Sequence, residues 1–289
     1  MAVKIKGNLK AINKVTPKNE FLVPAIENVL KNKVAGKDRN HGWNSPSGVS
    51  NCCRLTYFMR KDVEADYKAN EPRLQRIFDN GTCVHLRLQN YLLKSGVLLD
   101  DEAPLFNSEY KIMGTTDGLL LDGDTLAVLE IKSINAYGFN ALKDAKDEHK
   151  LQASVYLFCL NELRKDILRG KRKELESNYL EKLNSFLKGD KHKTKGEKVA
   201  EQFESFCKTL DLLEKYPKPL QKVIFLYESK DTQELKEFCF TDVKRVLKEA
   251  LDKFAYLNDC VDNNIAPPIE KSFNCNGCRF REVCKKNVY

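Results

Sequence analysis

The chain has 289 residues, of which 42% are apolar and 31% are charged. This composition supports a sizeable core and excludes collagen-like, low-complexity and wholly disordered chains. The length corresponds to one large domain or two small ones. The longest apolar runs, such as Leu119–Leu121 and Leu126–Leu129, are far too short to span a bilayer, and the first residues lack a signal peptide's apolar stretch. We therefore expect a soluble, intracellular protein without a membrane partner.

The basic residues are concentrated in two segments. Forty-nine Lys and Arg against 41 Asp and Glu give a net charge of +8. Residues 1–40 hold nine basic and three acidic residues, and residues 164–198 hold twelve and six, so each segment carries +6 and the remainder −4. This distribution favours a polyanionic partner, most simply nucleic acid, although two solvated lysine-rich surfaces would give the same counts.

Hydrophobic periodicity predicts the elements in chain order. Helices are expected over 24–33, 50–61 and 71–94, the last with an apolar stripe from Leu74 to Leu92. Strand-like segments cover 105–121 and 125–131. A helix over 144–163 and a lysine-rich helical region to about residue 216 follow. Segments 222–228 and 234–240 are expected to form a hairpin, and 241–261 a helix capped by Thr241.

The most informative stretch is 114–132, where two apolar runs flank an Asp-Gly-Asp turn at 122–124. If residues 123 and 124 form the loop, Asp117 lies directly opposite Glu130. If residues 122 and 123 form it, Asp117 faces Val128 and Glu130 is its diagonal neighbour. Both registers place Asp117, Glu130 and Lys132 on one face, because side chains alternate along a strand. A three-residue loop would break this parity.

Two opposed carboxylates repel each other and destabilise a bare sheet. A hard divalent cation coordinated by their oxygens would turn that repulsion into binding. Lys132, two residues beyond Glu130, would then orient a water nucleophile or stabilise charge on a phosphate. The alternative is a charged strand edge facing solvent.

The ten cysteines divide into two groups. Disulfides are not expected, since cytosolic thiols stay reduced. Five stand singly among apolar or helical patterns and are interpreted as small core residues: Cys83, Cys159, Cys207, Cys239 and Cys260. Cys275, Cys278 and Cys284 supply three soft ligands within ten positions, and Cys52 or Cys53 would supply a fourth. Four thiolates suit zinc and a 4Fe–4S cluster equally, and either would clip the early helix to the C-terminal tail.

Three helical residues are ambiguous on their own. His85 lies on or beside the apolar stripe of its helix, where a hydrogen-bonded core histidine is the commoner occupant. Gln152 and Tyr156 are four residues apart and so share a helix face, from which both could donate to phosphate oxygens.

Together, in this order, these motifs resemble the RecB-type nucleases of the PD-(D/E)xK superfamily, especially the branch with an iron–sulfur cluster that includes AddB-type subunits and the CRISPR-associated adaptation exonuclease. The resemblance runs from about Ser45 to Cys284. Residues 45–57 are similar to the family's opening cysteine segment, where a Cys-Pro-Arg run is usual, which favours Cys52 as the ligand. Residues 81–85 resemble its Gly-x-x-x-His helix.

The nuclease core and the helical motif complete the resemblance. Asp117 and Glu130-Ile-Lys132 are similar to the core, although Thr116 stands where the superfamily has proline. Gln152 and Tyr156 are similar to the helical Gln/Tyr motif. The resemblance implies an α/β, restriction-endonuclease-like fold with a mixed central β-sheet flanked by helices over 41–289. A basic arm over 1–40 would precede it, a helical lysine-rich insertion would occupy 164–216, and a cluster-binding tail 272–289.

The resemblance also implies roles for the site residues. Asp117, Glu130, His85 and the carbonyl of Ile131 would bind one or two Mg²⁺ or Mn²⁺ ions, and Lys132 would position the attacking water. A structural 4Fe–4S cluster, with zinc as the alternative, would be held by four cysteines: Cys52, Cys275, Cys278 and Cys284. Gln152, Tyr156 and Arg54 would contact DNA.

The implied activity is that of a metal-dependent DNA exonuclease acting on single strands or duplex ends, in DNA repair or recombination, in the cytoplasm of a bacterial or virus-infected cell. A structure-specific endonuclease and a non-catalytic nucleic-acid-binding module remain alternatives. The chain has no Gly-x-x-x-x-Gly-Lys-Ser/Thr phosphate loop, so a helicase or recombination partner would have to supply ATP-driven unwinding.

Overall fold

The computed structural model describes residues 21–33, 42–66, 72–186, 195–271 and 273–286. Most of the predicted basic arm, part of the predicted insertion and the last three residues of the tail lie outside the described residues. Among the described helices, none combines the length and the apolar character that a membrane span requires.

A five-stranded mixed sheet forms the centre of the molecule, in the order β1-β4-β5-β6-β7. Its strands are β1 (Leu98–Asp100), β4 (Gly118–Asp122), β5 (Thr125–Ile134), β6 (Val223–Ser229) and β7 (Leu235–Phe240). Neighbouring strands are antiparallel except β5 and β6, which run parallel. Strands β2 (Pro104–Asn107) and β3 (Ile112–Thr115) form a separate antiparallel hairpin.

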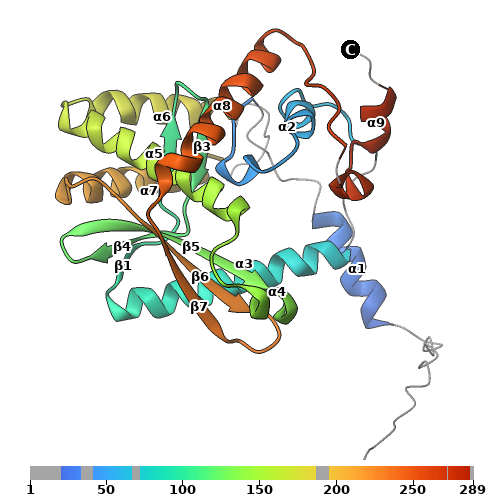
Figure 1. Ribbon diagram of the computed structural model, residues 1–289, viewed down its shortest axis with the longest axis horizontal. Coiled ribbons are helices and arrows are strands. Elements are labelled where there is room, and N and C mark those ends of the chain that lie inside the picture. Colours follow the sequence, from blue (N-terminus) through green and yellow to red (C-terminus); the bar gives the residue numbers. More distant parts are fainter. Residues whose placement is uncertain (1–20, 34–41, 67–71, 187–194, 272, 287–289) are drawn as a thin grey trace, which may run out of the picture.

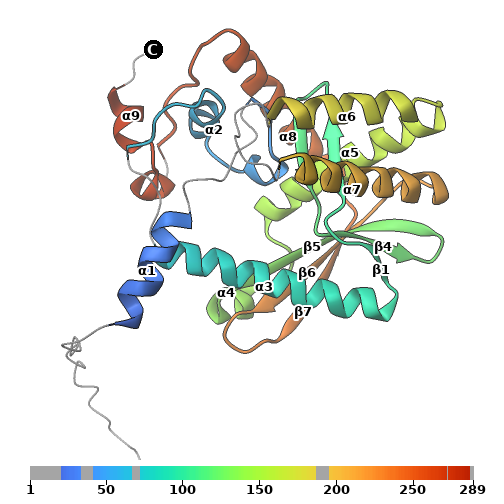
Figure 2. The ribbon, with the colours of Figure 1, turned by 180° about the vertical axis from the view of Figure 1, so that it is seen from behind.

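Strand β5 is the middle strand of the sheet. Both of its faces carry apolar side chains, as expected for a strand that helices cover on two sides. Leu129 and Ile131 face α3 (Pro72–Ser95), where they share a cluster with Val84 and Leu88. Val128 faces the opposite side, which α5 (Asp147–Leu168), α7 (Lys195–Lys215) and α8 (Val243–Asp262) cover. Figures 1 and 2 show the sheet between α3 on one side and α5, with the helices packed against it, on the other.

The predicted lysine-rich insertion contributes to the main core. It folds as α6 (Arg172–Phe186) and α7, which lie beside α5 in both views (Figures 1 and 2). Tyr179 stacks on Phe206 with ring centroids 3.9 Å apart, and both side chains are buried in the cluster that also contains Val128 and Phe225. The segment is therefore integral to the folded unit.

The remaining elements lie around the ends of these layers. They are α1 (Leu22–Lys33), α2 (Cys53–Arg60), α4 (Ala136–Ala141), α9 (Arg281–Lys286) and two 3₁₀ helices at Pro46–Gly48 and Phe273–Gly277. A third apolar cluster joins α2, the end of α8 and the tail through Tyr57, Phe58, Cys260 and Phe280. Residues more than 200 positions apart in the sequence therefore pack together.

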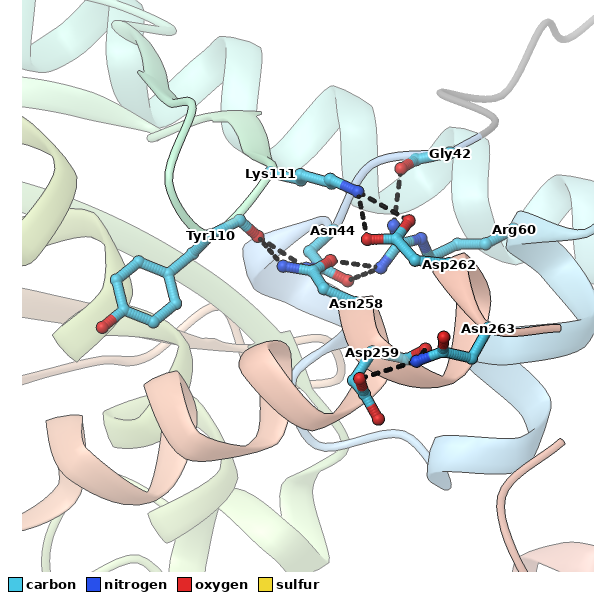
Figure 3. A network of polar contacts seen from close by, with 9 residues as sticks. All are labelled: Gly42, Asn44, Arg60, Tyr110, Lys111, Asn258, Asp259, Asp262 and Asn263. Atoms are coloured by element: carbon cyan, nitrogen blue, oxygen red, sulfur yellow. Dashed lines mark hydrogen bonds and ion pairs between the residues drawn. The ribbon is translucent and has the colours of Figure 1, made fainter. Parts of the chain in front are cut away.

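A buried arginine links this region to the β2–β3 hairpin (Figure 3). Arg60 is 7% exposed, and its guanidinium donates to Asn44 Oδ1 at 3.0 Å, Asn258 Oδ1 at 2.7 Å and the Gly42 carbonyl at 2.7 Å. The side-chain amides of Asn44 and Asn258 in turn both donate to the Tyr110 carbonyl. Four segments distant in sequence thus share one hydrogen-bonded network.

The sequence-based element predictions are largely confirmed, with some corrections. The hairpin over 222–240 is present, but β1 and α4 were not predicted, and Asp242 rather than Thr241 precedes α8 as its N-cap. The stripe of α3 is buried only in its second half, and Phe78 is 62% exposed. The second half is the part that packs on the sheet.

Two of the five cysteines assigned to the core are not there. Cys159 and Cys260 are buried and Cys207 is partly buried, whereas Cys83 and Cys239 are exposed. Cys239 lies on the edge strand β7, where alternate side chains face solvent. Cys83 precedes the buried Val84 on α3 and lines a solvent-open pocket with Arg87 and Glu228.

We predict that Arg60→Leu lowers the free energy of unfolding by about 3 kcal/mol, because it leaves the buried Asn44 Oδ1 and the partly buried oxygens of Asn258 and Gly42 without their charged donor. Urea unfolding followed by circular dichroism measures the change. Arg245→Leu is the matched control, since Arg245 pairs with Asp242 at an exposed site, and it should change stability by less than about 0.5 kcal/mol. Equal losses in the two variants would contradict a stabilising role for the network.

Candidate active site

Of the two registers considered for the β4–β5 hairpin, the structure has the one that places Asp117 opposite Glu130. Asp122 pairs with Thr125 and Gly118 with Leu129, so Gly123 and Asp124 form the two-residue loop. Gly123 has φ +62°, a conformation that glycine adopts without strain. Asp117, one residue before β4, therefore lies opposite Glu130. Its Oδ2 accepts the backbone N–H of Ile131 at 2.6 Å.

Glu130 is a buried carboxylate with one unsatisfied oxygen. It is 1% exposed, and its Oε1 forms an ion pair with Lys132 Nζ at 2.5 Å. Its Oε2 is buried and has no hydrogen-bond partner. Burial, followed by the charge of Asp117, raises the pKa of Glu130 to about 8, although Lys132 acts in the opposite direction. A buried oxygen without a partner destabilises the fold, so this arrangement requires a reason other than stability.

Helix α3 holds Asp117 from the other side. His85 Nδ1 lies 3.1 Å from Asp117 Oδ1, and Gln89 Nε2 donates to the backbone carbonyl of Asp117 at 2.9 Å. Burial lowers the pKa of His85, but the hydrogen bond to Asp117 and the charges of Asp117 and Glu130 outweigh it, so the net pKa is raised. His85 is therefore directed at the acidic residues. Gln89 was not predicted, and its spacing of four from His85 was the available sequence signal.

Helix α5 holds Lys132. The ammonium donates to Gln152 Oε1 at 3.2 Å, and Gln152 Nε2 donates to the Tyr156 hydroxyl at 2.5 Å. Tyr156 is buried, and burial, followed by the charges of Glu130 and Asp117, raises its pKa well above the ordinary value. The pair predicted to contact DNA thus lies in the site. In this structure Gln152 contacts Lys132, and Tyr156 positions Gln152.

A tyrosine–histidine pair borders Lys132 on the neighbouring strand. Tyr227 on β6 pairs with Lys132, and its hydroxyl lies 2.6 Å from His149 Nδ1 and accepts the Lys146 backbone N–H at 3.2 Å. Burial, together with the charges of Lys132 and Lys146, lowers the pKa of His149 to about 3, so this imidazole is neutral near pH 7. The sequence offered no signal for the pair, because it depends on parallel pairing of β5 with β6.

Three side chains at this site carry atoms of the kind that ligate hard divalent cations. Asp117 and Glu130 supply carboxylate oxygens, one of them unsatisfied, and His85 supplies an imidazole nitrogen. Within the described part of the chain, however, no group of three or more His, Cys, Asp or Glu side chains is placed so that it could hold a metal ion, either here or at the tail cysteines. Ile131, whose carbonyl was a predicted ligand, lies between Glu130 and Lys132 on β5.

The tail cysteines and the start of α2 come to the same end of the molecule. Burial raises the pKa of the Cys284 thiol, and the nearby thiols of Cys52 and Cys278 raise it further. Cys53, by contrast, is buried in the main core. Of the two cysteines that open α2, Cys52 is therefore the one beside the tail. Cys275 Sγ lies 3.7 Å from the Glu270 carbonyl.

Arg54 is buried rather than displayed for DNA. It is 5% exposed, and its guanidinium donates to the Pro267 carbonyl at 2.5 Å and lies over the Phe58 ring. A hydrogen bond from Arg54 also lowers the pKa of Cys284. We therefore interpret Arg54 as a structural residue of the α2–tail contact, because a DNA contact requires an accessible guanidinium.

Comparisons with known proteins do not identify a family. No family model matches the chain, and no curated protein matches it. Among solved structures, the chain is similar to one described as "Crystal structure of SSO0001", with 12% sequence identity, a TM-score of 0.46, and coverage of 93% of this chain and 99% of that chain.

We predict that, as pH rises from 5 to 8, the metal-free wild type loses stability relative to Glu130→Gln. The pKa of Glu130 is 4.5 in its reference state and about 8 in the fold, so between these values the folded state holds a proton that the unfolded chain has released. The difference between the two proteins should reach the order of 3 kcal/mol at pH 8. Urea unfolding in EDTA at several pH values measures it. Parallel pH profiles would show that Glu130 is ionised in the fold throughout.

Proposed function

We propose that this protein is a metal-dependent DNA nuclease with a restriction-endonuclease-like core, and that it acts as an exonuclease on single strands or duplex ends. The observation that supports the proposal most directly is the partnerless Oε2 of Glu130, buried beside Asp117 and Lys132. A binding module needs neither the opposed carboxylates nor the lysine, and both are costly to bury.

The proposed reaction is hydrolysis of a phosphodiester bond. Asp117, Glu130, His85 and the carbonyl of Ile131 would hold Mg²⁺ or Mn²⁺, which supplies Lewis-acid polarisation of the phosphate and a water of lowered pKa. Lys132 would orient the attacking water and stabilise the charge that develops on phosphorus-bound oxygens. The water oxygen forms a new P–O bond as the P–O bond to the leaving nucleotide breaks, in line.

The surrounding residues would position Lys132. Its ammonium is held between Glu130 Oε1 and Gln152 Oε1, at 2.5 and 3.2 Å, and Tyr156 anchors the amide of Gln152. A flexible lysine side chain is thereby restricted to one direction, toward the carboxylates. Such restriction lowers the entropic cost of bringing the ammonium to a bound water.

The tail cysteines support a second, structural part of the proposal. Cys52, Cys275, Cys278 and Cys284 would hold a 4Fe–4S cluster, with zinc as the alternative ion, and thiolates are the ligands that both prefer. The cluster would add a covalent clip to the existing contact between α2 and the tail. Arg54, which hydrogen-bonds Cys284, would stabilise the thiolate form.

DNA is the proposed macromolecular partner. The basic segments 1–40 and 164–198 would follow the phosphate backbone without reading bases, which makes binding steeply dependent on salt. Any ATP-driven unwinding would come from a helicase or recombination partner.

The direct test incubates end-labelled linear DNA with the wild-type protein and Mn²⁺. We predict degradation by the wild type and at least a hundredfold lower rates for Glu130→Gln and Lys132→Ala, because each removes a group from the reacting centre. Asp122→Asn is the matched control: it changes a carboxylate at the opposite, exposed end of the same hairpin and should keep full activity.

The same assay discriminates the alternatives. Cleavage of circular single-stranded DNA would indicate an endonuclease. Intact DNA with every metal tried, together with retained binding, would favour the non-catalytic module and overturn the proposal.

The cluster is tested by visible absorption and metal content of anaerobically purified protein. We predict a broad absorption band toward the violet end of the visible spectrum, from thiolate-bound iron–sulfur, that Cys278→Ser loses. Cys83→Ser is the control, since Cys83 is an exposed cysteine of α3, and it should keep the band. Zinc without colour would select the alternative ion, whereas neither metal in stoichiometric amount would reject ligation altogether.

A further inference from the structure

A pocket on the α3 side of the sheet carries cationic side chains that the proposed chemistry does not use. It has a volume of about 440 Å³ and opens to solvent between α3 and the turn that joins β6 to β7. Its lining includes Asn80, Cys83 and Arg87 of α3, Glu228 near the end of β6, and Lys230 and Gln233 of the turn. A volume of this size lies in the range of pockets that hold small ligands.

A buried carboxylate fixes the direction of Arg87 in this pocket. The side chain of Glu228 is 1% exposed, and both of its oxygens accept from Arg87 Nη2, at 2.7 and 2.6 Å. Gln233 Oε1 accepts from the same nitrogen at 3.1 Å. Among the described residues, Nε and Nη1 of Arg87 have no hydrogen-bond partner, and 38% of its side chain is exposed. The guanidinium is therefore held in place with two nitrogens able to donate to a ligand.

The turn after β6 supplies a second cation. Lys230 is partly exposed, and its ammonium has no ion-pair or hydrogen-bond partner in the part of the chain that the structure describes. Its backbone is fixed on both sides, since its N–H donates to the Ile134 carbonyl at 2.7 Å and its carbonyl accepts from Gln233 Nε2 at 3.3 Å. A positive charge is thus presented at the pocket without an anion of the chain to pair with it.

Gln233 keeps the two cationic residues together. Its φ of +62° lies in the left-handed region, which a residue with a side chain rarely adopts. From this position its side-chain amide accepts from Arg87 and donates to the Lys230 carbonyl. Strained backbone positions of this kind are concentrated at ligand sites.

The acidic residues around the pocket leave it with a positive balance. Glu228, the acidic residue in the lining, is paired with Arg87. Asp231 and Glu234 of the same turn do not line the pocket, and they accept hydrogen bonds from a backbone N–H of α4 and a threonine hydroxyl of the turn. A guanidinium and an ammonium beside two side-chain amides form a set of donors that suits phosphate.

The pocket lies close to the proposed reacting centre. Across the parallel pair of strands, Glu228 is opposite the residue that follows Lys132, so the Cα atoms of Glu228 and Lys132 are about 6 Å apart. On α3, His85, which contacts Asp117, precedes Arg87 by two residues. Both sites are therefore near the carboxyl ends of β5 and β6, the position at which α/β sheets commonly bind ligands.

We propose that this pocket is a second phosphate-binding site, in which Arg87 and Lys230 hold a phosphate of the DNA strand next to the one that is hydrolysed. This inference rests on the proposed function and adds to it a binding site separate from the reacting centre. Cationic donors bind the phosphate whatever base is attached to it. A strand with two or more phosphates uses both sites, whereas a diester with a single phosphate uses only the first.

The first test measures binding of a fluorescent single-stranded oligonucleotide at several salt concentrations, in Ca²⁺ and with strand integrity checked. Lys230→Ala should weaken binding by about threefold or more at low salt, and should lower the slope of log affinity against log salt by about 0.7, as for one lost phosphate contact. Lys94→Ala, in the last turn of α3, is the matched control and should change neither quantity. Arg87 is left intact, because its loss would leave the buried carboxylate of Glu228 unpaired.

The thiol of Cys83 reports directly on occupancy of the pocket, since it lines the pocket and is exposed. Alkylation by iodoacetamide, measured by peptide mass spectrometry, should slow at Cys83 when the oligonucleotide is bound, and should slow less in Lys230→Ala. Cys239, an exposed thiol on β7 outside the lining, is the reference. Inorganic phosphate at matched ionic strength separates the sources of the ligand. Protection of Cys83 by inorganic phosphate but not by the oligonucleotide would indicate a free-anion site and overturn the assignment to DNA.

A kinetic readout separates this site from the reacting centre. In Mn²⁺, Lys230→Ala should raise KM for DNA with kcat unchanged, and should hydrolyse bis(p-nitrophenyl) phosphate, a diester with one phosphate, as the wild type does. Unchanged DNA binding and salt slope in Lys230→Ala, or equal losses in Lys94→Ala, would overturn the inference and leave the nuclease intact. A wild type that binds DNA through Lys230 but cuts no substrate would instead contradict the proposed function and support the pocket.

Discussion

The repulsion between two carboxylates is the constraint around which this molecule is arranged. Pairing of β4 with β5 through a two-residue turn brings Asp117 opposite Glu130, which is 1% exposed and so has little water to screen it. One oxygen of Glu130 has no partner as a result. A glutamine at position 130 would have no negative charge to repel that of Asp117. The glutamate is therefore a residue that stability alone does not favour, and such residues are common at functional sites.

The supporting residues act on the two carboxylates from opposite sides of the sheet. From α3, His85 and Gln89 hold the side chain and the backbone of Asp117. From α5, Gln152 holds Lys132 against Glu130. The two helices belong to different apolar clusters, so the geometry of the site depends on both layers being packed at once. Packing of both helices on the sheet therefore fixes the positions of the Glu130 carboxylate and the Lys132 ammonium relative to Asp117.

Apolar packing and capping hydrogen bonds join the chain's early and late segments. Phe58 and Phe280 pack with ring centroids 5.5 Å apart. Asp66 accepts the backbone N–H groups of Glu282 and Val283 at the start of α9. In the Arg60 network, a hydrogen bond from Arg60 to Asn258 also joins α2 to α8 (Figure 3). A cluster at the cysteines would therefore reinforce an interface that packing and capping already form.

Local patterns determined the hairpin, its shared acidic face and the positions of most helices. The Asp-Gly-Asp turn and the alternation of β5 depend only on neighbouring residues, which is why Asp117, Glu130 and Lys132 could be grouped without coordinates. Tertiary structure alone decided which faces of the helices and of the edge strand β7 are covered. It left Phe78, Cys83 and Cys239 exposed and buried Arg54. It also supplied Tyr227 and His149, because parallel pairing of β5 with β6 joins residues 95 positions apart, as in Lys132 and Tyr227. Contacts of that kind depend on how whole layers pack, and no local sequence window contains that information.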